Sequence, residues 1–126
     1  MTVPQIAMTA PVGPTAAPLV VLGPSLGTST ILWEDVIPVL AADYRVVAWD
    51  LPGHGASSPS AEPCTVGQVA DAVAARVRDP SDGPIRYAGV SLGGAVGLEL
   101  SLRHPELVDR AAIVASGAQL GDASAW

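Results

Sequence analysis

The chain has 126 residues, with 6 Arg, no Lys and 12 acidic side chains, and its net charge is −6. The lack of lysine excludes both a P-loop lysine and a Schiff-base lysine. An acidic balance without a basic run argues against binding of nucleic acid or of an anionic membrane through charge. Hydrophobic residues make up 49% of the sequence and charged residues only 14%, which favours a packed core.

A single cysteine, Cys64, excludes an internal disulfide, and one Cys with two His cannot form a structural zinc site. No apolar run reaches the roughly 18 residues that a membrane span needs. The N-terminus lacks the basic stretch of a signal peptide. We therefore expect a soluble cytoplasmic protein whose residues 1–126 form a single domain.

Apolar segments and amphipathic segments alternate along the chain. Residues 19–23 form an apolar run that ends at Gly-Pro, which predicts a buried strand. Residues 30–42 place apolar side chains near one helical face, with a kink or a boundary at Pro38. Residues 45–50 predict the next strand, which ends at a Pro-Gly-His-Gly turn.

Residues 65–78 show the clearest helical periodicity, with Thr65 as the expected N-cap. Residues 85–90 then predict a third strand, residues 92–104 a third helix and residues 110–116 a fourth strand. Helices that fall between apolar strands are typical of a parallel sheet with both faces covered. The predicted fold class is α/β, a mostly parallel sheet with helices on both faces.

A G-x-S-x-G sequence occupies residues 89–93, where the third strand ends and the third helix begins. Chance alone gives this pattern in roughly one such sequence in ten, so its position is the evidence. A sharp turn between strand and helix strains the serine backbone and exposes the hydroxyl above the sheet, while the glycines leave room for neighbouring backbone. The helix N-terminus also favours negative charge there. We predict that Ser91 is a nucleophile; the alternative is a turn without chemistry.

Acyl transfer also needs two N–H donors for the oxyanion. The backbone N–H of Leu92, the residue after the serine, is the first candidate. The second is expected in the loop after the first strand, where Leu26 is the best candidate and Gly27 lets the backbone turn inward. An ordinary strand-to-helix turn is the alternative for that loop.

With these motifs the chain resembles the first half of an α/β-hydrolase, and more closely a 3-oxoadipate enol-lactonase, from about Leu19 onward. Most of the superfamily has His-Gly ahead of the oxyanion donor, whereas this chain has Pro24-Ser25 and then Leu-Gly-Thr, as in enol-lactonases. The resemblance rests on residues 23–28 (GPSLGT), 49–57 (WDLPGHGAS), 89–94 (GVSLGG) and 103–106 (RHPE), and the stretch 115–121 with Trp126 resembles the lead into the cap domain of those lactonases.

The resemblance implies hydrolysis of a small carboxylated enol-lactone of the 3-oxoadipate type, in the β-ketoadipate pathway of aromatic catabolism. Ser91 attacks the ring carbonyl, an acyl-enzyme forms, and water releases the open-chain 3-oxo acid. No metal or organic cofactor is implied. A carboxylesterase or a cofactor-free haloperoxidase of the same fold remains an alternative, as does a non-catalytic binding or assembly module.

The serine needs a base and an acid, which in this fold follow it in the order acid, then histidine. His54 precedes the serine, in a turn that the family uses structurally. His104 follows it by about three helical turns, near 20 Å along the axis, and cannot reach the hydroxyl. Asp122 is expected to be a loop residue rather than the acid, Asp50 to brace the His54 turn, and Cys64 to have no role.

We therefore expect the triad acid, the histidine and the cap beyond residue 126, so that this chain alone is inactive. The strand at 110–116 would then leave an apolar sheet edge open to pairing. A cleaved enzyme with an associated C-terminal fragment, a truncated chain, and a domain-swapped or homo-oligomeric half all fit, and the first is favoured. Besides such a partner, we expect only a small lactone or ester substrate to bind.

Overall fold

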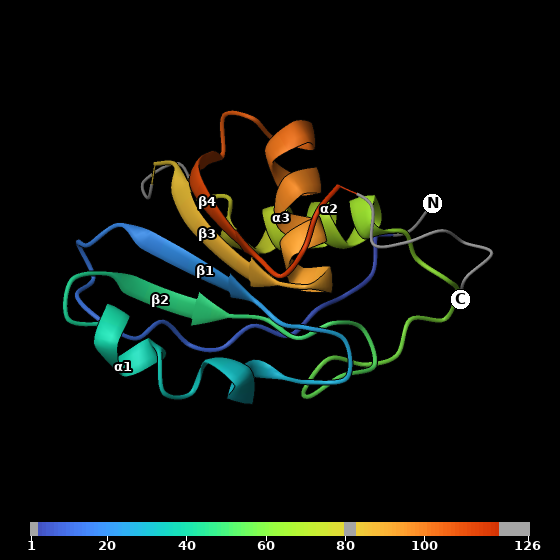
Figure 1. Ribbon diagram of the computed structural model, residues 1–126, viewed down its shortest axis with the longest axis horizontal. Helices are drawn as coiled ribbons and strands as arrows, with labels where there is room; N and C mark the ends of the chain where they lie inside the picture. The colour runs from blue at the N-terminus through green and yellow to red at the C-terminus, as the bar shows by residue number, and fades with distance from the viewer. Residues whose placement is uncertain (1–2, 80–82, 119–126) are drawn as a thin grey trace.

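The computed structural model describes residues 3–79 and 83–118, and these build one parallel sheet (Figure 1). The four strands lie in the order β2-β1-β3-β4, and every neighbouring pair is parallel. The bounds of the strands are Leu19–Gly23 for β1, Arg45–Ala48 for β2, Ile85–Val90 for β3 and Val108–Val114 for β4. Because all four run the same way, the loops that follow them gather at one edge, where ligands bind in open α/β sheets.

Helices cover both faces of the sheet, which confirms the α/β class (Figure 1). The bounds are Thr30–Trp33 for the 3-10 helix η1, Ile37–Leu40 for α1, Val66–Val77 for α2 and Leu92–Arg103 for α3. The α2 and α3 helices pack together on one face, and η1 and α1 lie on the other. Thr65 caps α2 as expected, because its hydroxyl accepts the Gln68 N–H and the Gln68 side chain accepts the Thr65 N–H.

The β1 strand is buried along its whole length because it has a core on each side. Leu19 and Val21 pack in the cluster beneath α2 and α3. Val20 and Leu22 pack in the second cluster with Trp33. This alternation explains why the sequence of β1 reads as a continuous apolar run.

The segment over residues 30–42 is divided into two short helices, so of the kink and the boundary expected at Pro38 the structure has the boundary. It forms η1 and then the short α1, with Val36 as the N-cap residue of α1. Pro38 lies in the first turn of α1, where its missing N–H costs no helical hydrogen bond. Proline therefore marks a helix start here and not a kink within a helix.

The predicted bounds of two strands also differ from the structure. The fourth strand starts two residues earlier than predicted, because Ile85 N–H already bonds to the Leu107 carbonyl and Ile85 pairs with Val108. It ends at Val114, since Ala115 has φ +49° and leaves the extended conformation. The second strand ends at Ala48, two residues before the predicted end.

The two edges of the sheet differ. The N-terminal segment runs antiparallel beside β2, with bridges Met8–Trp49 and Val12–Val46. On the other side, β4 pairs only with β3 among the described residues, and most of its side chains are exposed. Within residues 3–79 and 83–118, no helix has the length and apolar character needed to cross a membrane.

Candidate active site

Ser91 forms the turn between β3 and α3, with φ +54° and ψ −115°. This conformation costs a residue other than glycine about 1–3 kcal/mol, so the surrounding structure must hold it. The Ser91 N–H donates to the Val114 carbonyl at 2.9 Å, and the Ser91 carbonyl accepts the Ser116 hydroxyl at 2.6 Å and the Ala95 N–H at 3.0 Å. The strained serine backbone that the sequence predicts is present.

Glycines allow close packing around this turn. A Cβ on Gly89 would overlap the carbonyl of Gly93, and one on Gly93 would overlap the Gly23–Pro24 backbone at the end of β1. A Cβ on Gly94 would lie 2.7 Å from Cβ of Ser116. These contacts bring α3 against β1 and β3, so the prediction that the glycines make room for backbone is confirmed.

Tyr87 supports the same turn and was missed by the sequence reasoning. Its hydroxyl donates to the Gly93 carbonyl at 2.7 Å inside the core. Burial raises the pKa of Tyr87, and the phenol therefore stays protonated and remains a donor. A hydroxyl-bearing aromatic at an inward position of β3, four residues before the serine, was the available signal.

The loop after β1 forms a tight turn over residues 25–28. The Ser25 carbonyl accepts both the Thr28 N–H at 3.3 Å and the Thr28 hydroxyl at 2.7 Å. Gly27 has φ +80°, which glycine adopts without strain. The inward turn predicted for this loop therefore has the backbone conformation that it requires.

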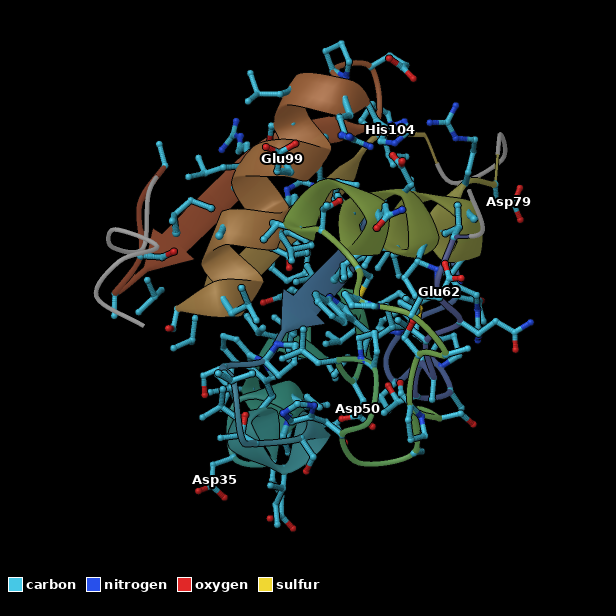
Figure 2. The ribbon with its side chains drawn as sticks, turned by 90° about the vertical axis from the view of Figure 1, so that its right-hand side faces the viewer. Asp35, Asp50, Glu62, Asp79, Glu99 and His104 are labelled. Carbon is cyan, nitrogen blue, oxygen red and sulfur yellow. The ribbon has the colours of Figure 1, made fainter. Side chains whose placement is uncertain are left out.

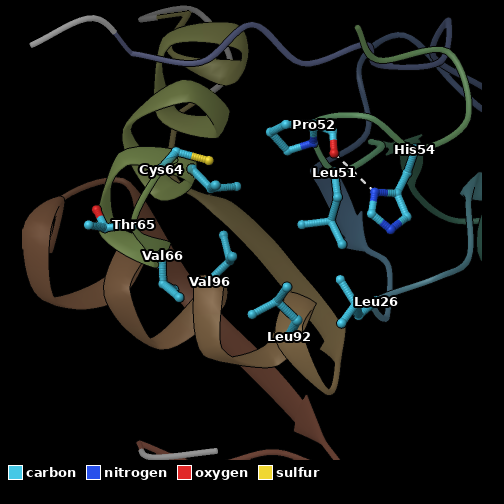
Figure 3. Close-up of a pocket in the computed structure, with 10 residues that line it drawn as sticks. Leu26, Leu51, Pro52, His54, Cys64, Thr65, Val66, Leu92 and Val96 are labelled. Atoms are coloured by element: carbon cyan, nitrogen blue, oxygen red, sulfur yellow. Dashed lines mark hydrogen bonds between the residues drawn. The ribbon is translucent and has the colours of Figure 1, made fainter. Parts of the chain in front are cut away.

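An apolar cavity of about 220 Å³ brings the two predicted oxyanion residues together (Figure 3). Leu26 reaches it from the loop after β1, and Leu92 from the first turn of α3, directly after Ser91. Cys64 lies in the cavity wall just before α2, a position that the sequence reasoning did not give it. The cavity is lined by Leu26, Leu51, Pro52, His54, Cys64, Thr65, Val66, Val69, Leu92 and Val96.

Asp50 joins the loops that follow β1 and β2. Its Oδ1 accepts the Thr30 N–H and its Oδ2 accepts the Ala56 N–H, each at 2.9 Å, and its carbonyl accepts the Ser57 hydroxyl at 2.8 Å. The residue is only 4% exposed. The expectation that Asp50 braces the turn around His54 is confirmed.

The two histidines are both engaged away from Ser91. His54 accepts the Gly27 N–H at Nε2 and contacts the Pro52 carbonyl through Nδ1, each at 3.0 Å. His104 contacts Asp71 through Nε2 at 2.9 Å and Arg78 through Nδ1 at 2.8 Å. Figure 2 shows His104 at the far end of α3, well separated from Asp50. Both histidines therefore have the structural roles expected for them.

In the part of the chain that the structure describes, no histidine or acid is hydrogen-bonded to the Ser91 side chain. The same residues contain no group of three or more His, Cys, Asp or Glu side chains that could hold a metal ion. Asp122 and Trp126 lie outside the described residues. The site thus consists of a serine turn, two candidate N–H donors and an apolar cavity.

Comparisons with known proteins agree with this geometry. The family model of the alpha/beta hydrolase fold matches residues 18–126. A pimeloyl-(acyl-carrier protein) methyl ester esterase of Neisseria meningitidis is 43% identical over 94 residues, which are 75% of this chain and 35% of that protein. The 3-oxoadipate enol-lactonase 2 of Acinetobacter baylyi is 30% identical over 109 residues, 86% of this chain and 41% of that protein.

Among solved structures, the enol-lactonase from Burkholderia xenovorans has a TM-score of 0.87 to this chain at 28% identity. The match covers 96% of this chain and 47% of that one. The chain therefore spans less than half the length of each of these relatives.

Proposed function

Since this chain belongs to the α/β-hydrolase family, we propose that it is the nucleophile-bearing part of a serine hydrolase that cleaves carboxylic esters. The observation that carries this proposal is the strained Ser91 backbone between β3 and α3, at the edge where the strand ends meet. A turn without chemistry has no use for a serine at φ +54°. The esterase and lactonase names of the relatives support the same reaction class.

In the proposed reaction, Oγ of Ser91 attacks the carbonyl carbon of the ester, and its proton passes to a histidine. The N–H groups of Leu92 and Leu26 stabilise the oxyanion. The C–O bond breaks as the histidine passes its proton to the leaving oxygen, which leaves an acyl-enzyme; water then attacks the acyl carbonyl, gives its proton to the histidine and releases the acid, and the proton returns to Oγ. The fold family's chain order puts the acid and the histidine after the serine, and we place both beyond residue 126.

For the substrate we propose a small carboxylated enol-lactone of the 3-oxoadipate type. The similarity to two enol-lactonases and the Ser-Leu-Gly-Thr turn at residues 25–28 support it. In a lactone the leaving oxygen stays tethered to the acyl group, so the acyl-enzyme holds the whole opened ring.

A methyl ester esterase is the second candidate. The Neisseria relative with that name has the higher identity, 43%. In addition, the residues that line the cavity are mostly aliphatic and include no arginine, so its wall offers no cation to a carboxylate. This wall suits an aliphatic acyl chain.

We also propose that the second part of the hydrolase fold covers the open edge of β4. The exposed strand, with Val114 at 47% exposure, and the shorter length relative to each relative support this partner. The partner segment would extend the parallel sheet and bring the acid and histidine to Ser91.

Labelling with a fluorophosphonate, read by intact mass, tests the reaction class. We expect one adduct on the protein when the second part is present, and no adduct on Ser91→Ala. Substrate assays with an enol-lactone and with methyl esters of short diacids then separate the two substrates. Absence of an adduct even with the second part present would identify a non-catalytic binding module.

A further inference from the structure

His54 connects the two loops that follow β1 and β2. Its Nε2 lies 3.0 Å from the Gly27 nitrogen, and its Nδ1 lies 3.0 Å from the Pro52 carbonyl oxygen (Figure 3 shows the second contact). A backbone N–H can only donate, so Nε2 must present a lone pair. The ring proton is then on Nδ1 and is donated to Pro52. This arrangement requires a neutral imidazole.

The turn that carries His54 is held firmly by backbone hydrogen bonds. The His54 N–H donates to the Leu51 carbonyl, and the His54 carbonyl accepts the Ser57 N–H, each at 2.9 Å. Asp50 fixes the same turn through the Ala56 N–H. The imidazole is therefore presented from a rigid position.

The peptide that His54 contacts has little other support. The ends of the turn over residues 25–28 are tied together, but the central peptide joins Leu26, whose side chain is 65% exposed, to Gly27. A Cβ at Gly27 would meet nothing within 4 Å. Glycine accepts both signs of φ, so the backbone alone does not select one orientation of this peptide. Rotation of the peptide would change ψ of Leu26 and φ of Gly27 and so move the path of the loop that carries Leu26.

We propose that neutral His54 is a positioning residue, which accepts the Gly27 N–H through Nε2 and so holds in place the loop over residues 25–28 that carries the Leu26 N–H. The role of Leu26 rests on the proposed function, whereas the hydrogen bond to Gly27 does not. Protonation would place a hydrogen on Nε2 facing the Gly27 N–H and break this bond. The titratable groups nearby are Asp50, whose carboxylate is bound to Thr30 and Ala56, and Cys64 across the cavity.

The tautomer of His54 can be measured directly on 15N-labelled protein by long-range proton–nitrogen correlation. We expect a protonated Nδ1 and an unprotonated Nε2 at neutral pH, and a Gly27 amide resonance that moves with the His54 titration. His104 is an internal control that should have the opposite tautomer. Arg78 donates to its Nδ1, so its ring proton belongs on Nε2. An Nε2-protonated His54, or a Gly27 amide that does not respond to it, would overturn the proposal.

Two variants then test the consequence for the reaction. His54→Gln keeps a neutral acceptor near the Nε2 position, and His54→Leu keeps the bulk without an acceptor. With the second part of the fold present, we expect the rate of Ser91 labelling to fall by about 10- to 100-fold in His54→Leu and to return close to wild type in His54→Gln. Equal rates in the two variants would contradict a positioning role.

Failure of the proposed function gives a different result from failure of this inference. Wild-type protein that never labels even with the second part present would refute the hydrolase, and the NMR measurement would still decide whether His54 accepts the Gly27 N–H. The thermal unfolding midpoints of both variants serve as a folding control. If His54→Leu labels slowly because it is unfolded at the assay temperature, the slow labelling would not come from the lost acceptor and the positioning role would be contradicted.

Discussion

At the scale of single residues, the backbone conformation of Ser91 lowers the stability of the folded chain. Its φ of +54° is one that glycine adopts freely and serine does not. The position is nevertheless held from both sides by Val114 and Ala95. Under the proposed function, this strain is the cost of presenting the serine at the turn between β3 and α3.

Replacing the serine by glycine should relieve this strain. We expect Ser91→Gly to increase the free energy of unfolding by about 1 kcal/mol, measured by urea denaturation, because the strain released exceeds the added chain entropy. It should also abolish labelling. Ser101→Gly, at a regular position in α3, is the matched control and should lower the same free energy by about 0.5 kcal/mol. Equal destabilisation by both changes would show that Ser91 carries no strain.

A second prediction concerns the close approach of α3 to β1. Gly93→Ala should lower the free energy of unfolding by about 2–3 kcal/mol, since its Cβ would overlap the Gly23–Pro24 backbone, which cannot move aside. Gly117→Ala is the control, because a Cβ there meets nothing within 4 Å. Thermal unfolding of the two variants side by side provides the measurement, and similar midpoints would contradict the packing described.

At the scale of elements, the loops after β1 and β2 act as one unit because Asp50 binds both. In Asp50→Asn, one carboxylate oxygen becomes an NH₂ group that faces a backbone N–H, so one loop loses its acceptor. We expect the free energy of unfolding to fall by about 1–3 kcal/mol and labelling of Ser91 to slow. Exposed Asp43→Asn should change the free energy by less than about 0.5 kcal/mol. An unchanged denaturation midpoint in Asp50→Asn would refute this coupling of the loops.

The sequence was most informative where local rules decide the structure. The apolar run of β1, the capping box at Thr65 and the glycines around Ser91 each encode their conformation within a few residues. For the segment over 30–42 the sequence left a kink and a boundary at Pro38 open, because apolar periodicity alone does not separate two short helices from one bent helix.

Contacts between distant segments could not be read from periodicity. The bond from Gly27 to His54 joins loops 27 residues apart, and its existence depends on β1 and β2 being neighbours in register. The cavity position of Cys64 depends in the same way on how α2 packs against α3. For the site, the sequence therefore predicted which residues carry the chemistry better than what holds them in place.

At the scale of the whole molecule, the sheet is covered on both faces over β1 but only partly over β4. Ala112 pairs with Ala88, and Val114 with Val90, on the side away from α3. There the exposed Val114 extends the apolar surface to the edge of the sheet. This is the surface that we assign to the second part of the fold.

Hydrogen–deuterium exchange tests this assignment. In the chain alone, we expect peptides from Val108–Val114 to exchange faster than peptides from Leu19–Gly23, because within residues 3–79 and 83–118 one side of β4 has no pairing partner. Addition of the second part should slow exchange in β4 and leave β1 unchanged. Exchange in β4 that is slow without a partner, in protein whose native mass is that of one chain, would contradict an open edge.

The N-terminal segment beside β2 determines how such molecules can associate. Among residues 3–79 and 83–118, β4 is the strand whose outer side carries no paired segment, whereas the bridges at Met8 and Val12 place a segment beside β2. Two copies could join through their β4 strands, and the outer edges of such a pair would be the N-terminal segments beside β2. Repeated end-to-end addition, the route by which open sheets grow into fibrils, needs two available edges per molecule. Two isolated bridges make a short, irregular edge, so we expect assembly through this sheet to stop at one partner per chain, which the native mass of the assembled protein would measure.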